Sequence, residues 1–506
     1  MKCKILYIGF LSMMLGLGAC IDDESTFETV VVPQLAVNGS GEETMPIYNF
    51  DLGTDCVITP EISYTGNADD LQYEWSIGTY TNGTKGVLEV VSKERTLNHR
   101  FTEGGSYYAH LVITDGQVGR TVDYQININR TFESGYFLVS NDENGKGNLV
   151  FVKTMTPEEM EASTEQVYIE HSIEHMNEGT NVAKLLNTIY VTQTSENWQA
   201  GSFNRLVALA EDRAIFLDPN TLSILAELKY DEVYSGFKAT NFIPDGYAPF
   251  LYDAKQEKYV HLNMEYMFPY ENSEYVGYGF EDFISTTYYM WGGWYSTVMY
   301  ANYSSDEICE YNAYYYYYGY DSPFVGVGDL LEGAKLQTAF FENSSAPLYI
   351  LTRSKADEGI AYLHKLPGGI SYMDSPYYDA PSKTELAIGA DVAFPEEGTR
   401  LIYSSTYARH FYVYDDKIYV ALVSNAATPF PKKSEYAISF SGEEITYMDI
   451  NTTTEEVYVA TYNESTKRGS FYIYDAKDIR TDNQGKITPK AVHKECADRI
   501  VSILNK

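Results

Sequence analysis

Hydrophobic and polar residues alternate with a period of two along much of the chain, in short runs separated by polar turns. This alternation predicts antiparallel β-strands, because successive side chains of a strand point to opposite faces of the sheet. The clearest run follows Gly104-Gly105 and places four side chains on one face: Tyr107, Ala109, Leu111 and Ile113. Another run, Tyr73–Ile77, carries Trp75. Residues 42–130 are therefore predicted to form a β-sandwich with Trp75 in its core.

From residue 131 onward, the alternation recurs as triplets of strands with polar turns between them. The clearest triplet consists of Ile445–Ile450, Glu456–Thr461 and Ser470–Asp475. Such triplets are typical of the blades of a β-propeller, and residues 131–506 suit about seven blades of four strands. The lone strand Arg499–Leu504 is predicted to pair with Tyr136–Ser140, which would complete the first blade and remove an open edge.

Regular alternation stops in residues 266–320, which are dense in tyrosine. We expect part of this segment to be a long insertion over one face of the ring. Trp291 and Trp294 flank Gly292-Gly293, a pair that suits an exposed tight turn. Aromatic side chains in such a turn offer flat faces that stack on sugars or peptide side chains. The candidate ligand- or partner-binding residues are Tyr289, Trp291, Trp294 and Tyr295. The competing interpretation is that these residues fill the gap between a blade and the insertion.

The beginning of the chain has a different pattern. Lys2 and Lys4 precede an apolar run from Ile5 to Leu17, which is too short to span a bilayer as a helix. Small residues then lead to Cys20, and the acidic triplet 22–24 follows. This arrangement resembles a bacterial lipoprotein signal, and the acidic triplet resembles the surface-export signal of Bacteroidota lipoproteins. The resemblance implies a signal peptide at 1–19 and lipidation of Cys20. The polar composition of 20–41 predicts a tether, with room for one early strand at Val30–Val32. The alternative is an ordinary signal peptide in which Cys20 is incidental.

Charge and cysteine content narrow the function classes. Acidic residues outnumber basic ones 71 to 36, which gives a formal net charge of -35. A surface of this sign repels phosphate backbones and anionic headgroups, so we expect no nucleic-acid partner and membrane contact through the lipid alone. Beyond Cys3 and Cys20, three scattered cysteines remain: Cys56, Cys309 and Cys496. They form no disulfide framework or paired metal motif, and we expect isolated buried thiols with at most one bridge.

Two motifs resemble metal sites but occur in the wrong context. His171–His175 fits H-x-x-E-H, yet strand-like residues precede it and the turn 177–179 follows, which leaves room for one helical turn rather than a long zinc-binding helix. Asp142 to Gly145 resembles the start of a calcium loop, but Lys153 stands where the bidentate glutamate belongs, so we predict a hairpin turn. No nucleophile elbow, phosphate loop or dinucleotide fingerprint occurs. We therefore predict no catalytic motif, metal or cofactor, while paired carboxylates for glycoside hydrolysis stay open.

Two further resemblances add to the lipoprotein signal around Cys20. A predicted strand contains Trp75, and Phe101, Gly104 and a strand that ends at Asp115 follow it. This order of features resembles the PKD family of immunoglobulin-like sandwiches. Together with the tyrosine-rich blades, the whole chain resembles the PKD-like surface lipoproteins of Bacteroidota, which are encoded beside SusC/SusD-type outer-membrane importers. The PKD module implies presentation rather than chemistry, and the family has no established catalytic residues.

The resemblance implies an outward-facing, lipid-anchored outer-membrane protein. It would act as an accessory binding or scaffold component of TonB-dependent nutrient uptake, with a SusC/SusD-type importer as its partner and a glycan or peptide as its ligand. The alternative hypothesis is a surface hydrolase, a glycosidase or peptidase, with its site at the propeller channel.

Overall fold

The structure is a computed structural model. It describes residues 32–40, 45–81, 83–156, 160, 166–193, 203–243, 250–263, 267–276, 282–288, 296–312, 324–326, 331–342, 347–366, 371–372, 376–377, 382–423 and 428–506. The chain divides into two compact units. The first contains residues 57–99, 106–126 and those up to Tyr48, and the second contains 49–56, 100–105 and 127–506.

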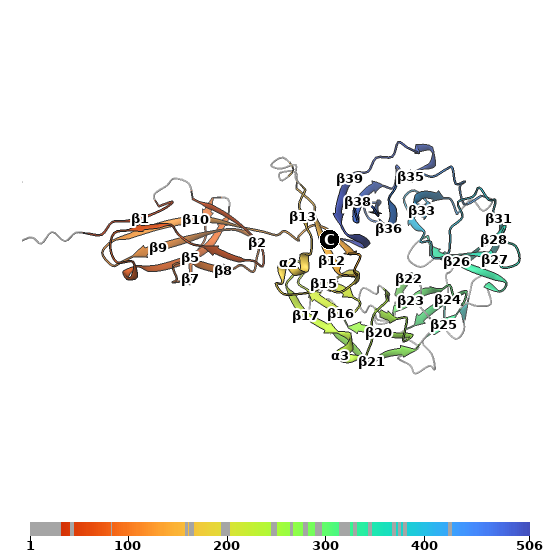
Figure 1. Ribbon diagram of the computed structural model, residues 1–506, viewed down its shortest axis with the longest axis horizontal. Helices are drawn as coiled ribbons and strands as arrows, with labels where there is room; N and C mark the ends of the chain where they lie inside the picture. The colour runs from red at the N-terminus through yellow and green to blue at the C-terminus, as the bar shows by residue number, and fades with distance from the viewer. Residues whose placement is uncertain are drawn as a thin grey trace, which may run out of the picture. The chain divides into compact units, whose positions relative to one another are not determined.

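The N-terminal strands form the predicted antiparallel sandwich (Figure 1). Its main sheet has the order β2 (Ile47–Asp51), β10 (Gly119–Asn129), β9 (Gly105–Thr114), β5 (Gln72–Thr81) and β6 (Thr84–Lys85), and β7 (Glu89–Ser92) also pairs with β5. Two smaller pairs are β1 (Leu35–Val37) with β4 (Ile62–Tyr64), and β3 (Asp55–Ile58) with β8 (Leu97–Arg100). The 3-10 turn η1 (Ala68–Asp70) precedes β5.

Trp75 lies in the sandwich core, as predicted. Its side chain is fully buried, its indole Nε1 donates to the carbonyl of Glu94 at 3.0 Å, and its ring lies 5.5 Å from that of Tyr124. Leu111 is its cross-strand neighbour on β9 and is also fully buried. The buried indole therefore packs inside the sandwich and has its one polar atom satisfied.

The sandwich begins earlier than the predicted boundary at residue 42. Strand β1 falls inside the segment predicted to be a tether, and its register pairs Leu35 with Tyr64 and Val37 with Ile62. Leu35 and Val37 are buried, whereas Ala36 between them is exposed. Three residues are too short a run for alternation to stand out, so the sequence did not reveal this strand.

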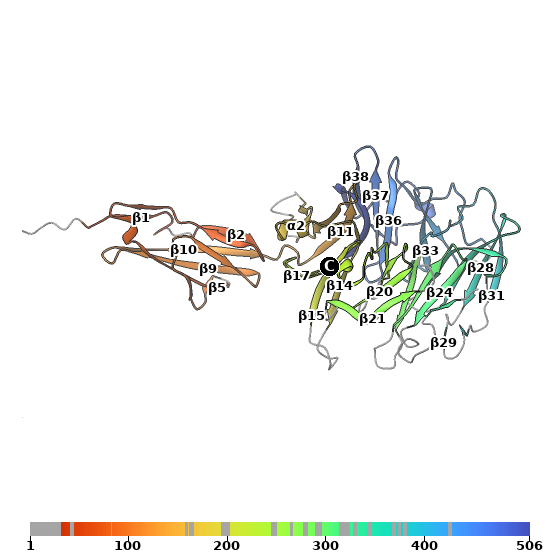
Figure 2. The same ribbon diagram turned by 60° about the horizontal axis from the view of Figure 1, so that its bottom comes forward.

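The second unit contains seven four-stranded antiparallel sheets within its described residues, arranged around a ring (Figures 1 and 2). The first blade consists of β40 (Arg499–Asn505), β11 (Gly135–Asn141), β12 (Gly147–Lys153) and β13 (Tyr168–Ile169). The second to fourth blades follow in chain order: β14 (Leu185–Gln193), β15 (Phe203–Ala210), β16 (Arg213–Leu217) and β17 (Ile224–Lys229); β18 (Asn241–Ile243), β19 (Phe250–Asp253), β20 (Lys258–Asn263) and β21 (Phe268–Val276); and β22 (Asp282–Tyr288), β23 (Ser296–Asn302), β24 (Glu307–Asn312) and β25 (Phe324–Gly326). The fifth to seventh blades are β26 (Ala334–Phe341), β27 (Leu348–Ser354), β28 (Ile360–Leu366) and β31 (Ser382–Ala387); β32 (Ile402–Ser404), β33 (Arg409–Tyr414), β34 (Lys417–Ala421) and β35 (Ile438–Ser439); and β36 (Glu444–Asn451), β37 (Glu456–Asn463), β38 (Arg468–Asp475) and β39 (Ala491–Ala497). The predicted β-propeller of about seven blades is confirmed.

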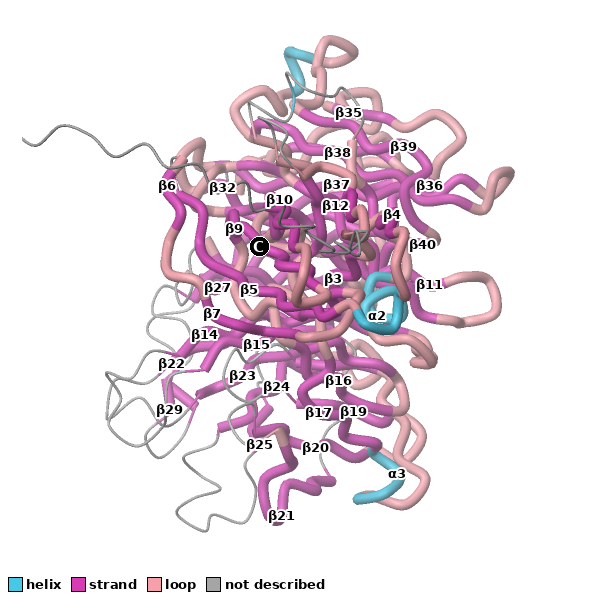
Figure 3. Tube along the Cα trace, turned by 90° about the vertical axis from the view of Figure 1, so that its left-hand side faces the viewer, coloured by secondary structure: helices cyan, strands magenta, loops and turns pink. Residues whose placement is uncertain are grey.

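Few other elements accompany the blades. A small sheet pairs β29 (Ser371–Tyr372) with β30 (Pro376–Tyr377). Within the described residues of the propeller, the helices are α2 (Ser172–Met176) and α3 (Tyr230–Val233), with a 3-10 turn η3 (Thr481–Asn483), and strands dominate the rest of the trace (Figure 3). Over the part of the chain that the structure describes, no helix is long and apolar enough to cross a membrane.

The predicted ring closure is also confirmed. Strand β40 pairs antiparallel with β11 from Tyr136↔Asn505 to Asn141↔Arg499, and so occupies the position that the first strand holds in the other blades. Ile500 and Ile503 of β40 are buried in a core shared by the first and seventh blades. Backbone bonds in both directions between Gly135 and Lys506 extend the pairing.

The described part of residues 266–320 consists mainly of blade strands, and an insertion predicted for part of this segment would lie in the residues that the structure does not describe. Strands β21, β22, β23 and β24 fall within 266–320 and belong to the third and fourth blades. Tyrosine has a high β-propensity, so a tyrosine-rich stretch suits blade strands, and its unusual composition concealed the regular pattern.

Hairpin turns in the propeller repeat one hydrogen-bonding pattern. An aspartate or asparagine side-chain oxygen accepts the backbone N–H two residues further on, at Asp218, Asp253, Asn451 and Asn463. The residue four positions later has a positive φ in each case: Leu222, Glu257, Glu455 and Lys467. These Asx turns set the hairpin geometry locally, which explains why polar turn residues recur between the strands.

Candidate functional site

The site residues predicted from sequence lie outside the described residues. Cys20 precedes the first described residue, and the aromatic set Tyr289, Trp291, Trp294 and Tyr295 falls between β22 and β23. These two strands pair antiparallel, with Tyr288 opposite Ser296. The aromatic site and the lipidation of Cys20 therefore stay predictions.

The H-x-x-E-H segment forms a single helical turn. His171 precedes α2 in a left-handed conformation with φ 50°, and α2 has five residues. The His171 Nδ1 and Lys146 Nζ atoms each lie 3.7 Å from Glu174 Oε1. Among the residues placed by the structure, no three His, Cys, Asp or Glu side chains form a group that could hold a metal ion.

The predicted hairpin turn at Asp142 to Gly145 is confirmed. It joins β11 to β12, and the Asp142 Oδ1 atom accepts the backbone N–H groups of Asn144 and Lys146, each at 2.8 Å. Gly145 adopts a positive φ of 77°. The Asp142 carboxylate thus stabilises its own turn, and its pKa is lowered chiefly by the Lys146 N–H bond.

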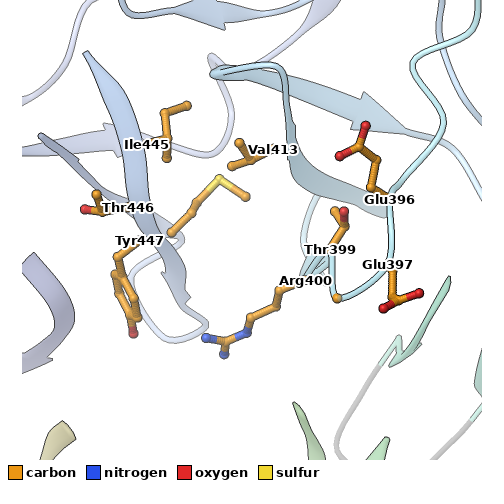
Figure 4. Close-up of a pocket in the computed structure, with 10 residues that line it drawn as sticks. Glu396, Glu397, Thr399, Arg400, Val413, Ile445, Thr446 and Tyr447 are labelled. Carbon is orange, nitrogen blue, oxygen red and sulfur yellow. The ribbon is translucent and has the colours of Figure 1, made fainter. Parts of the chain in front are cut away.

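A pocket of about 330 Å³ lies between the sixth and seventh blades and offers a site that sequence reasoning missed (Figure 4). One side is formed by β36, and the other by the loop that leads into β32 together with β33. Its lining residues are Glu396, Glu397, Gly398, Thr399, Arg400, Val413, Ile445, Thr446, Tyr447 and Met448. Met448 is buried, and Val413 and Ile445 pack against the same interblade core.

Ion pairs and hydrogen bonds join the two sides of this pocket. The Arg400 guanidinium lies 3.1 Å from both carboxylate oxygens of Asp449, a residue of β36. The Tyr447 hydroxyl donates to Asp449 Oδ2 at 3.0 Å. Burial first, and then the nearby Asp449 charge, raise the pKa of Tyr447, so its phenol stays protonated. Figure 4 shows the Arg400 and Tyr447 side chains reaching toward the same side.

The loop before β32 carries two exposed glutamates. The Glu397 carboxylate pairs with Lys335 Nζ at 2.6 Å. Glu396 has no hydrogen bond or ion pair through its carboxylate within the described ranges. Gly398 adopts a positive φ of 76°, and its N–H donates to the carbonyl of Gln337 at 2.9 Å, which holds the loop against the fifth blade. The carboxyl groups of Glu396 and Glu397 point to opposite sides of the loop (Figure 4).

The amino-acid sequence gives little indication of this pocket. Residues 396–400 look like an ordinary polar loop, and Asp449 looks like a solvent-facing position of a blade strand. The two parts meet because β32 and β36 are the first strands of neighbouring blades, and the sequence contains no motif that links them. Alternation on β36 does place Tyr447 and Asp449 two residues apart, the spacing of one strand face.

Comparisons with known proteins concern the fold alone. No family model matches the chain, and no curated protein matches it. Among solved structures, the chain is similar to a quinonprotein alcohol dehydrogenase-like protein from Bacteroides thetaiotaomicron, at 14% identity and a TM-score of 0.47, covering 93% of this chain and 99% of that chain. It is also similar to apo AztD from Citrobacter koseri, at 7% identity and a TM-score of 0.32, covering 86% of this chain and 98% of that chain.

Proposed function

We propose that the protein is an outward-facing outer-membrane lipoprotein, anchored through Cys20, that binds a glycan or peptide for a TonB-dependent importer of the SusC/SusD type. The lipoprotein-like N-terminus and the PKD-like resemblance support the location and the partner. The observation that carries the binding role is the pocket between the sixth and seventh blades, which combines an apolar wall with charged groups from a separate loop. Ligand pockets of proteins have this character.

The arrangement of its acids favours binding over hydrolysis. A glycosidase needs two carboxyl groups that face one bond from opposite sides. Here Asp449 is held by Arg400 and Tyr447, and Glu397 is paired with Lys335. The remaining acid, Glu396, points away from Glu397 (Figure 4). Among the described residues that line the pocket, Glu396 is therefore the one acid without a partner, and no two carboxylates face each other.

Purification from the native outer membrane in mild detergent tests the proposed function. We expect the full chain to co-purify with a TonB-dependent importer and to carry a glycan or peptide. Cys20→Ala should release the protein from the membrane, because the lipid is the proposed anchor. The mutant remaining with outer membranes at high salt would reveal another anchor, and the absence of any importer from the native preparation would contradict the assembly.

The predicted aromatic site provides a second test. Trp291→Ala with Trp294→Ala should weaken ligand or importer binding at least tenfold, because stacked aromatics are typical hot spots worth on the order of 2 kcal/mol each. The thermal midpoint should stay nearly unchanged. A large drop in the midpoint together with lost binding would instead assign both tryptophans to packing. Trp75→Ala is the matched control for a core tryptophan and should lower the midpoint of the sandwich.

A further inference from the structure

We propose that the pocket between the sixth and seventh blades binds the side chain of a lysine or arginine in a peptide ligand. This inference rests on the proposed function, which leaves the ligand as either a glycan or a peptide. It commits to the peptide and to the chemistry of the side chain that enters.

The apolar wall suits the aliphatic part of such a side chain. Val413, Ile445 and Met448 line the pocket and belong to one interblade core. Lysine and arginine carry long apolar stems that pack along surfaces of this kind while their charged heads stay near water. At about 330 Å³, the pocket is at the small end of ligand sites and fits one long side chain better than an extended oligomer.

The charges of the pocket leave one carboxylate for a cationic head group. Arg400 is neutralised by Asp449, and Glu397 by Lys335. Glu396 is exposed and, over the described ranges, its carboxylate has no partner of opposite charge. Glu396 is one of the residues that line the pocket, together with Val413. A cation seated there gains a charge-assisted hydrogen bond, and the net charge of -35 draws cations toward the protein.

Other ligand classes fit the pocket less well. An acidic sugar or phosphate would face Glu396, while the Arg400 guanidinium is already bound to Asp449. A neutral sugar gains most from an open aromatic face. Tyr447, the aromatic residue of this lining, is half-buried and packs against the core between the seventh and first blades. A basic side chain can bind without an unpaired arginine and without an exposed aromatic ring.

The test uses the full chain in detergent micelles and a set of pentapeptides. Blocked Gly-Gly-X-Gly-Gly peptides with X as Lys, Arg, Gln or Glu are titrated by isothermal calorimetry. We expect the Lys and Arg peptides to bind about threefold more tightly than the Gln peptide, because the ion pair forms at an exposed carboxylate, and the Glu peptide to bind most weakly. Glu396→Gln should remove the preference for Lys over Gln without changing the thermal midpoint. Glu358→Gln makes the same charge change at an exposed position outside the pocket and should leave the preference intact.

Three results would overturn the inference: equal binding of the Lys and Gln peptides, an unchanged preference in Glu396→Gln, or an equal loss in Glu358→Gln. The proposed function is judged separately by importer co-purification. If the importer co-purifies and the Lys peptide shows no preference, the basic-side-chain inference fails alone. If the native preparation contains neither importer nor ligand, the proposed function fails as well.

Discussion

Buried histidines of the propeller differ in how their ring nitrogens are satisfied. His364 lies with Nε2 3.2 Å from Thr352 Oγ1 and is buried. His410 is 1% exposed, and neither ring nitrogen has a hydrogen-bond partner in the described parts of the chain. Its ring centroid lies 4.9 Å from that of Phe340 and 4.7 Å from that of Tyr403. An aromatic cage of this kind suits a hydrocarbon ring better than an imidazole.

His410→Phe should therefore stabilise the propeller by about 1–2 kcal/mol, because it removes two unsatisfied polar atoms and keeps a planar ring. A rise in the thermal midpoint by scanning calorimetry checks this expectation. His410→Ala is the control for lost packing and should cost roughly 2–4 kcal/mol. A phenylalanine variant that melts as low as the alanine variant would show that the imidazole has a polar partner after all.

The elements that could be predicted from the sequence are those that a pattern within one short segment indicates. Alternation predicted the strands of the sandwich and most blades, and an unpaired terminal strand indicated ring closure. Strand β1 escaped because three residues carry too little periodicity, and the blades within 266–320 escaped because tyrosine density masked the alternation. The pocket escaped for a different reason. Arg400 and Asp449 are brought together by the packing of two blades, which no run of residues encodes by itself.

Strand β40 provides the clearest prediction at the scale of elements. Deleting residues 499–506 should unfold or aggregate the propeller, because the first blade loses its inner strand and a core loses Ile500 and Ile503. The sandwich should keep its own thermal transition. A truncated protein that melts at the midpoint of the parent would show that β40 does not hold the ring.

Two point variants in β40 compare a new charge at a buried position with the same charge at an exposed position. Ile500→Asp places a charge at a fully buried position of β40 and should destabilise the propeller by at least about 3 kcal/mol. Asn505→Asp adds the same charge at an exposed position of the same strand and should cost far less, although it loses the bond from the Asn505 amide to the Tyr458 hydroxyl. Urea unfolding followed by circular dichroism measures both. Equal losses in the two variants would contradict a specific role for the β40 core.

For the whole molecule, burial of histidines makes stability depend on pH. Burial lowers the pKa of His410 to about 3 and of His364 to about 4, in the latter case with help from Lys383. Burial also lowers the pKa of His493. In the unfolded chain these groups bind protons below about pH 6.5. The unfolded state therefore takes up more protons than the folded state as the pH falls from 6.5, and the folded state loses stability.

We expect the thermal midpoint of the propeller to fall between pH 6.5 and 4.5. His410 alone should contribute about 1.4 kcal/mol per pH unit in this window. Acids with a lowered pKa, such as Glu443 and Glu455, start to lose their contribution only as the pH approaches their ordinary value of 4.5, so the upper part of this window isolates the histidines. His410→Phe should flatten the pH profile, measured by calorimetry in matched buffers. An equally steep profile in this variant would place the acid sensitivity elsewhere.

The pairing of β11 with β40 has a consequence for how the protein is made. During translation, β11 emerges before the other six blades, and its inner partner follows all of them. The first blade therefore stays incomplete throughout synthesis, with an open edge that only the late strand can cover. A chain that ends before β40 cannot complete the first blade, so the propeller ring closes only in a full-length chain. A delay of this kind would also suit the export that we propose, because a chain is threaded through a membrane before it folds.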